Sequence, residues 1–373
     1  MENISKYMIS FIKKEIMLIL FFLLLVILSL LYPHNIISYP HFIDWRTIMA
    51  LTGLLVITTG LKESGYFNFI TKRMLKKFHD ERTLSLFLVL FSALLSAFIT
   101  NDITLFIVIP LTFSIQSVIK NDISKLIIFE AIAVNVGSAL TPIGNPQNLY
   151  LWHRWNISFL YFIFKMSPLV IIQLVLLLIF IWIVFPREKI RNSNEKNVEK
   201  YKKPLLWSSI ILMLVYIVSI ELKLTYIVLI IIILFYFLTY RKILLKVDWL
   251  LILLFMIIFI DFHIVSNIPI ISRIVRSVME SNSAGKVFSL SILTSQLISN
   301  VPASVFISKF TNNWFAISYG VNIGGNGLVI GSIANIIALR MSNSKNIWIN
   351  FHKFSVPFLL VTSAIVYVLF FLV

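Results

Sequence analysis

Residues 135–148 read NVGSALTPIGNPQN, and residues 322–335 read NIGGNGLVIGSIAN. Five positions are identical at the same spacing, because Asn135, Gly137, Ile143, Gly144 and Asn148 each recur 187 residues later. Both segments lie in long apolar stretches, where glycine and proline interrupt a helix and where an unpaired amide is costly to bury. The repetition therefore predicts two broken helices, and it divides the chain into two related halves.

The composition places the chain in a lipid bilayer. Of its 373 residues 59% are hydrophobic and only 13% are charged, and the mean hydropathy is +0.94. Apolar runs of about 20 residues, the length that a helix needs to cross hydrocarbon, recur along the chain and exclude a membrane barrel of short alternating strands. The net charge of +16 is carried by short loops, which indicates membrane topology and not a nucleic-acid partner. The sequence thus predicts an all-α polytopic membrane protein.

The basic loops orient the predicted spans, since cytoplasmic loops collect Lys and Arg. The N-terminus and the loops near residues 62–82, 120–125, 187–203, 241–246 and 340–345 are basic, whereas residues 32–41 carry no Lys or Arg. Threading the chain through these loops gives about nine transmembrane helices, two re-entrant hairpins that enter from opposite faces, and a cytoplasmic N-terminus. The first apolar run, residues 16–31, is interpreted as a retained span.

The same threading divides the chain at a basic cytoplasmic linker, residues 186–204. The first half, residues 1–185, has a hairpin tip near 100–102 and a broken helix over 126–152. The second half, residues 205–373, has a hairpin tip near 299–302 and a broken helix over 314–339. The halves face opposite sides of the membrane, so they form an inverted repeat, and such repeats place one shared site near the bilayer midplane.

The two hairpin tips differ in chemistry. The first carries Thr100, Asn101 and Asp102, whose oxygens suit Na⁺ or whose carboxyl can exchange a proton. The alternative is that Asp102 only caps the following half-helix. The second tip carries Ser299 and Asn300 and no acid. The site is therefore expected to be asymmetric, with the coupling ion held by one half and the substrate by the other.

The broken helices add further candidate ligands. Their small residues could simply permit close helix packing, but packing does not require repeated amides at membrane depth. Glu130 lies one turn inside its span and is either an interfacial residue or a proton carrier. Asp261 falls near the outer end of its span and is expected to be solvated, and Arg340 is expected to anchor a cytoplasmic end. The candidate binding residues are Thr100, Asn101, Asp102, Asn135, Gly137, Thr141, Gly144, Asn145, Asn148, Ser299, Asn300, Asn322, Gly324, Asn326 and Asn335, with Asp102 and Glu130 as possible proton carriers and Na⁺ possible at Asn101 and Asp102.

These motifs resemble the ion transporter superfamily, which includes arsenite permeases, sodium/proton antiporters, and citrate or dicarboxylate carriers. The resemblance rests on TNDITLFIVIPLT from Thr100, EAIAVNVGSALTPIGNPQN from Glu130, SNVP from Ser299 and VNIGGNGLVIGSIAN from Val321. The Asn-Asp tip is most similar to the arsenite permease and anion permease branch, whereas the divalent-anion branch typically shows Ser-Asn-Thr at both tips. By this similarity, site-lining positions would be Asn101, Asp102, Gly137, Thr141, Asn145, Asn300, Gly324 and Asn326.

The resulting hypothesis is a secondary active transporter in the inner (cytoplasmic) membrane that moves a small inorganic ion, either arsenite or another anion, or exchanges Na⁺ for H⁺. A citrate or dicarboxylate carrier is the alternative within this class, and an ion channel is the alternative outside it. No catalytic residues, enzyme activity or cofactor other than a coupling Na⁺ or H⁺ is expected. A homodimer and a separate ATPase subunit are possible partners, and nucleic acid is not.

Overall fold

The computed structural model describes residues 15–67, 69–70, 78, 80–116, 122–190, 200–279, 283–342, 344 and 346–372. These residues form 17 α-helices and no strand. An isolated antiparallel bridge between Asp80 and Lys189 joins two loops. The all-α prediction is confirmed. Several predicted loops lie partly outside the described residues. These parts are residues 1–14 at the N-terminus, residues 71–77 of the basic loop, Lys120, and residues 191–199 at the centre of the predicted linker.

The described elements fall before and after the linker expected at residues 186–204. In the first half they are α2 (Ile16–Leu31), the 3₁₀ helix η1 (Pro33–Ser38), α3 (Tyr39–Phe42), α4 (Trp45–Glu63), α6 (Glu81–Phe98), α7 (Asn101–Ser114), α8 (Ser124–Ser138), α9 (Pro146–Trp155) and α10 (Phe159–Val184). In the second half they are α11 (Lys203–Glu221), α12 (Thr225–Leu244), α13 (Trp249–Asn267), α14 (Pro269–Met279), α15 (Ala284–Ile298), α16 (Asn300–Ile307), α17 (Trp314–Gly324), η2 (Val329–Gly331), α18 (Ile333–Met341) and α19 (Ile347–Phe370).

Six described helices are long and apolar enough to cross a membrane by themselves: α6, α10, α11, α12, α13 and α19. Helix α2 with the bent segment that follows it makes a seventh candidate. The sequence count of about nine is higher because it includes α4 and the two broken pairs, α8 with α9 and α17 with α18. It also treats α6 as one arm of a hairpin, although its 18 residues suffice for a full span.

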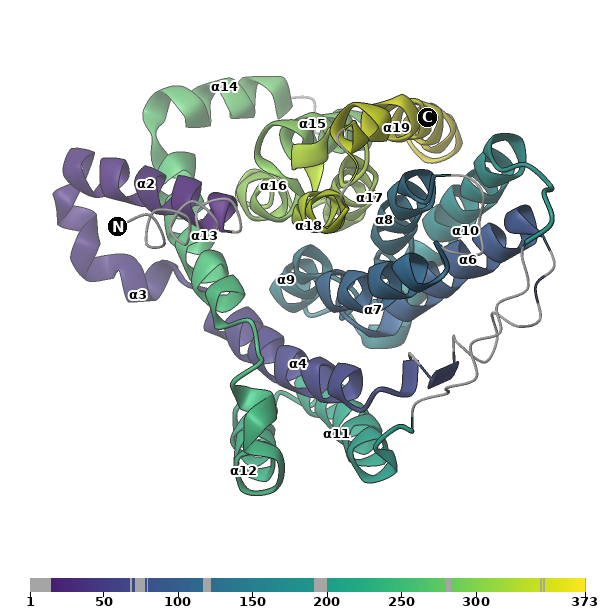
Figure 1. The fold of residues 1–373 in the computed structure, drawn as a ribbon. Coiled ribbons are helices and arrows are strands. Elements are labelled where there is room, and N and C mark those ends of the chain that lie inside the picture. The colour runs from purple at the N-terminus through teal and green to yellow at the C-terminus, as the bar shows by residue number, and fades with distance from the viewer. Residues whose placement is uncertain are drawn as a thin grey trace, which may run out of the picture.

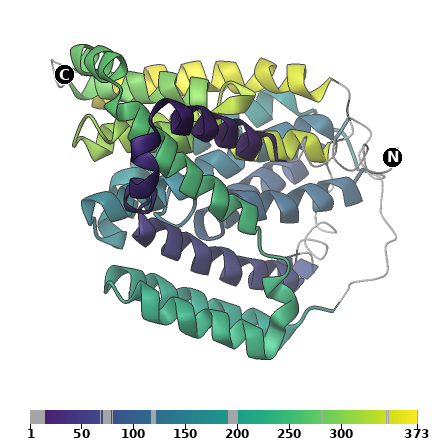
Figure 2. The same cartoon turned by 90° about the vertical axis from the view of Figure 1, so that its left-hand side faces the viewer.

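The helices form two groups (Figure 1). Helices α2, α4, α11, α12 and α13 lie along one side, and we call them the frame. Helices α6–α10 and α15–α19 form a second bundle, which we call the core. Within the frame, α4 packs against both α11 and α12, and α13 packs against α2. Figure 2 shows α11 and α12 as an outer layer below α4.

Frame helices α4 and α13 begin in the same way. Asp44 and Asp248 cap them by accepting the backbone N–H of Thr47 and Leu251, each at 3.1 Å. The indole of the following tryptophan donates to a carbonyl five residues earlier, from Trp45 to Pro40 and from Trp249 to Leu244. An Asp side chain at this position satisfies a helix N–H that otherwise lacks a partner, so the shared Asp-Trp pair fixes both helix starts.

Candidate functional site

The first hairpin consists of α6 and α7, and its tip meets the break between α8 and α9. The chain turns at Ile99 and Thr100, and the backbone N–H of Asn101 donates to the Gly144 carbonyl at 3.2 Å. From the same break, the hydroxyl of Thr141 donates to the Ala97 carbonyl. The tip predicted at residues 100–102 is therefore tied by hydrogen bonds to the broken helix of its own half.

The second hairpin, α15 and α16, meets the break between α17 and α18. Ser299 at its tip has φ 75° and ψ 153°, a backbone conformation that is almost confined to glycine. The amide of Asn300 packs against Gly325, since a Cβ added to that glycine would lie 2.9 Å from the Asn300 Nδ2 atom. Strain in a non-glycine residue at a buried tip is typical of functional sites.

Gln296 braces this second break, and sequence analysis missed it. Its Nε2 donates to the carbonyls of Gly324 at 2.6 Å and Asn326 at 2.9 Å, while its Oε1 accepts the Leu328 N–H at 2.7 Å. One amide side chain thus satisfies three backbone groups freed where α17 ends. The signal was present in the sequence as a polar residue within the apolar arm, three positions before the tip.

Two amide pairs link the halves at the centre of the core. Asn135 Nδ2 donates to Asn335 Oδ1 at 2.7 Å, and Asn322 Nδ2 donates to Asn148 Oδ1 at the same distance. Asn135 and Asn322 are repeat equivalents, and so are Asn148 and Asn335. The two hydrogen bonds therefore connect each broken helix to the other in a reciprocal arrangement.

Further amide contacts hold the starts of the second half-helices. Asn145 caps α9, because its Oδ1 accepts the Asn148 N–H at 2.9 Å, and its Nδ2 donates to Asn322 at 3.0 Å. Asn148 Nδ2 also lies within 3.2–3.4 Å of three carbonyls of the break, those of Ser138, Ala139 and Thr141. Ser332 caps α18 at the position equivalent to Asn145. The amides thus have a structural role in addition to any ligand role.

Two repeated glycines allow the broken helices to lie against the hairpins. A Cβ at Gly137 would lie 1.9 Å from the Ala93 carbonyl oxygen on α6, and a Cβ at Gly324 would lie 2.6 Å from the Ser295 Cβ on α15. Gly144 is restricted in the same way by the Ser138 carbonyl. These contacts agree with the packing interpretation of the small residues, which operates alongside the amide network.

The tips retain unused hydrogen-bonding groups. Thr100 Oγ1, Asp102 Oδ1, Ser299 Oγ and both amide atoms of Asn326 are buried and have no hydrogen-bond partner among the described residues. An unsatisfied buried polar atom costs about 1–3 kcal/mol, so several at one place need an explanation such as a bound ion or water. All of these atoms belong to residues that the sequence predicts to bind the ion or the substrate.

Asp102 also lines a cavity of about 260 Å³ between the core and the frame. Its walls come from α2, α7, α13 and α18, and include Asp248 and Arg340. The side chain that sequence analysis assigned to a membrane anchor, Arg340, therefore shares a cavity with the candidate coupling carboxylate. This cavity is a direct approach to the first tip from the end of the molecule where α13 begins.

Two other acids lie apart from the tips. Glu130 is fully buried in α8, and its Oε1 accepts the Thr112 hydroxyl at 2.6 Å, while Oε2 has no partner among the described residues. Asp261, which was expected to be solvated, is fully buried, and neither of its carboxyl oxygens has a described partner. That expectation was wrong because helices α2, α3, α4 and α16 pack around α13.

Four helices begin where the hairpin tips meet the helix breaks, and we call this region the tip cluster. These helices are α7, α9, α16 and α18. The start of α7 lies beside the Gly144–Asn145 break where α9 begins. The start of α16 lies beside Gly325, whose carbonyl accepts both Asn135 and Asn335. Helix N-termini carry partial positive charge and free N–H groups, so the tip cluster suits an anion, and the carboxyl of Asp102 adds a place for a cation or a proton.

Comparison with known proteins gives a family. Residues 7–313 match the model described as citrate transporter. The inner membrane protein YbiR of Escherichia coli (strain K12) is 40% identical over 94% of this chain and 95% of its own length. The uncharacterized transporter MJ0456 of Methanocaldococcus jannaschii is 37% identical over 87% of both chains. The uncharacterized transporter Rv2684 of Mycobacterium tuberculosis is 23% identical over 88% of this chain and 86% of its own. None of these matches singles out the arsenite permease branch.

Proposed function

Because this chain belongs to the citrate transporter family, we propose that it is a secondary active transporter of a small anion, coupled to H⁺ or Na⁺. The observation that carries the proposal is the meeting of both hairpin tips with the two helix breaks. Four half-helix N-termini begin there, and several polar atoms are buried without partners. This combination favours a negatively charged ligand and disfavours a purely structural role for the tip cluster.

In this proposal Asp102 carries the coupling ion. A carboxylate held out of water needs a proton or a cation, and Asp102 adjoins Thr100, whose hydroxyl is free to act as an oxygen ligand. Binding of H⁺ or Na⁺ neutralises the carboxylate and so favours an anion beside it. This gives the two ligands a reason to bind together, which coupled transport requires.

Transport also requires that the site face each side of the membrane in turn. We infer that the hairpin-bearing core moves against the frame, in an elevator or rocking motion, and that the two halves act as inverted repeats. The cavity beside Asp102 supports this view, because residues of both groups form its walls. In this arrangement the molecule lies in the inner membrane with its N-terminus in the cytoplasm, and the cavity opens inward.

The leading substrate is a small inorganic anion or arsenite, since the Asn-Asp tip departs from the Ser-Asn-Thr pattern of divalent-anion carriers. A citrate-like carboxylate is the second candidate, and the description of the matching family favours it. Both candidates share the anion chemistry of the site. They differ in size and in the number of negative charges that must be compensated.

Uptake into proteoliposomes tests the proposal. We expect saturable accumulation of one radiolabelled anion among arsenite, phosphate, citrate and succinate under an imposed pH or Na⁺ gradient. We also expect counterflow, in which unlabelled internal substrate accelerates labelled uptake. Flux that rises linearly with concentration and shows no counterflow would indicate a channel, and the transporter proposal would be wrong.

A further inference from the structure

A second pocket, of about 370 Å³, lies at the opposite end of the core–frame boundary. It is formed by the start of α4, the end of α9 with the turn before α10, and the turn between α11 and α12. Its lining shares no residue with the cavity beside Asp102. The sequence analysis singled out none of its residues, and the proposed transport site does not use them.

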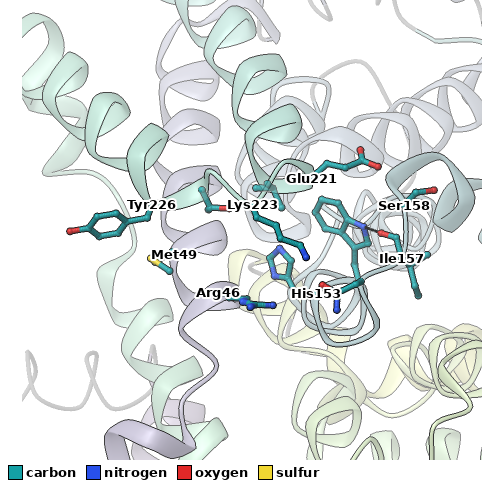
Figure 3. Close-up of a pocket in the computed structure, with 12 residues that line it drawn as sticks. Arg46, Met49, His153, Ile157, Ser158, Glu221, Lys223 and Tyr226 are labelled. Atoms are coloured by element: carbon teal, nitrogen blue, oxygen red, sulfur yellow. Dashed lines mark hydrogen bonds between the residues drawn. The ribbon is translucent and has the colours of Figure 1, made fainter.

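The lining is rich in positive charge. Figure 3 shows the long side chains of Arg46 and Lys223 reaching toward the ring of His153. Within the described part of the chain, neither the Arg46 guanidinium nor the Lys223 ammonium has a hydrogen bond or ion pair. Two cations that face one pocket repel each other, and an anion between them relieves that repulsion.

Two carboxylates lie near these cations, and neither forms an ion pair with them within the described residues. Glu221 also lines the pocket and keeps its negative charge, but Figure 3 shows its carboxylate directed away from Arg46 and Lys223, and its Oε1 accepts the Phe159 N–H at the start of α10 at 3.2 Å. Asp44 is not part of the lining; it caps α4 through the Thr47 N–H and interacts electrostatically with His153. His153 contacts the Thr47 hydroxyl through Nδ1 at 3.3 Å, which leaves Nε2 for a ligand. Three nitrogen-bearing side chains, those of Arg46, Lys223 and His153, can therefore contact one ligand in the pocket.

The backbone holds these groups in place at some cost. Lys223 has φ 61° and Asn156 has φ 48°, so both turns that line the pocket place a non-glycine residue in the left-handed region. A lysine is less stable there than glycine, whereas asparagine tolerates this region, and such residues commonly end a helix, as Asn156 ends α9. The two turns belong to different groups, one to the frame and the other to the core.

We propose that this pocket binds an oxyanion, a phosphate or carboxylate group held between Arg46 and Lys223 with a hydrogen bond from His153. The ligand is either a free anion or the headgroup of an anionic lipid, since both present the same chemistry. Arg46 and Lys223 belong to the frame and His153 to the core, so the ligand bridges the two groups. The proposal does not depend on which substrate crosses the membrane.

The test uses the purified full chain in phosphatidylcholine nanodiscs titrated with inorganic phosphate or citrate by calorimetry. A second set of nanodiscs contains phosphatidylglycerol, and thermal unfolding is followed without added anion. The variant is R46Q with K223Q. The control is R273Q with K286Q, which removes the same charge from exposed residues outside the pocket. R46K, which keeps the charge, covers the case in which the double variant does not fold.

We expect the pocket variant to raise the Kd for a free anion about tenfold or more, or to abolish the stabilisation by phosphatidylglycerol, while the control changes neither. The first result assigns the pocket to a free anion, and the second assigns it to a lipid headgroup. R46K should retain most of the binding. If neither probe binds the parent protein, or if the pocket variant and the control behave alike, the proposal is wrong.

Discussion

Asn135 and Asn322 each donate a hydrogen bond to a side-chain amide in the other half of the chain. Asn135 also donates to the Gly325 carbonyl, and Asn322 donates to the Ser318 carbonyl. Removing Asn135 leaves Asn335 Oδ1 buried without a donor, although the Gly325 carbonyl still accepts Asn335, and removing Asn322 leaves Asn148 Oδ1 without one. These single residues therefore contribute to both the stability and the relative position of the two broken helices.

We expect Asn135→Ala to destabilise the protein by about 1–3 kcal/mol, because it leaves the acceptors of Asn335 and Gly325 without this donor. Thermal unfolding in detergent measures the change. Asn335→Ala and the double variant complete a cycle that isolates the pair. The control is Asn267→Ala, an exposed amide that contacts only its own helix. Additive effects of the two single variants would contradict the direct pair.

Ser299 provides a second test on the residue scale. Its backbone lies in a region where glycine is favoured, so Ser299→Gly should raise the thermal stability by about 1 kcal/mol. Ser299→Ala keeps the strain and removes only the hydroxyl. If the hydroxyl binds substrate, both variants should raise the KM for transport, although only the glycine variant gains stability. Equal stability of the two variants would show that the tip is unstrained.

The sequence predicts these residues unequally well. The repeated amides were identifiable because they recur with the same glycines. Gln296 was missed because its counterpart in the first hairpin is Ala97, so no repetition marks it. Asp261 was misplaced because position along a span does not reveal which helices cover it. Burial of a single side chain depends on tertiary packing, which periodicity alone does not specify.

On the scale of helices, each hairpin packs closely against the broken helix of its own half. Gly137 brings α8 against α6, and Gly324 brings α17 against α15. The helix ends at Phe98, Ser138, Ile298 and Gly324 lie where glycines, prolines and polar residues interrupt otherwise apolar runs. Sequence analysis could not separate a hairpin arm from a full span, since α6 is long enough for either.

Gly137→Ala should prevent close packing of α6 and α8, because the new Cβ would lie 1.9 Å from a backbone oxygen that has little freedom to move. We expect the free energy of unfolding to fall by about 1–3 kcal/mol or more, or the variant not to fold at all. Size-exclusion chromatography and thermal unfolding measure both outcomes. Gly285→Ala is the comparison, since its Cβ would approach other atoms no closer than 3.0 Å. A folded, equally stable Gly137→Ala protein would refute this packing.

On the scale of the whole molecule, the core and the frame meet along a boundary with a cavity at each end. The cavity beside Asp102 lies at one end and the Arg46 pocket at the other. Neither was predictable from the sequence, because the first combines residues of four helices and the second combines residues of three segments that lie far apart in the chain. If transport moves the core against the frame, a covalent link across this boundary should stop it.

The absence of native cysteines makes that link easy to introduce. Thr47 and His153 are in contact across the boundary, and Thr47→Cys with His153→Cys, joined by a short reversible thiol cross-linker, should abolish transport until the link is reduced. The matched control joins Tyr150 and Ser308, which contact each other within the core. Full transport by the linked boundary pair would contradict relative motion of the two groups.

The central claim is that Asp102 couples an ion gradient to anion transport. The most direct measurement is gradient-driven accumulation of the transported anion in proteoliposomes by the parent protein, by Asp102→Asn, and by the control Asp80→Asn, which alters a partly exposed acid at the start of α6. The account predicts that Asp102→Asn folds normally but no longer accumulates anion in response to a pH or Na⁺ gradient, whereas the control does. Accumulation by Asp102→Asn equal to that of the parent protein would contradict it.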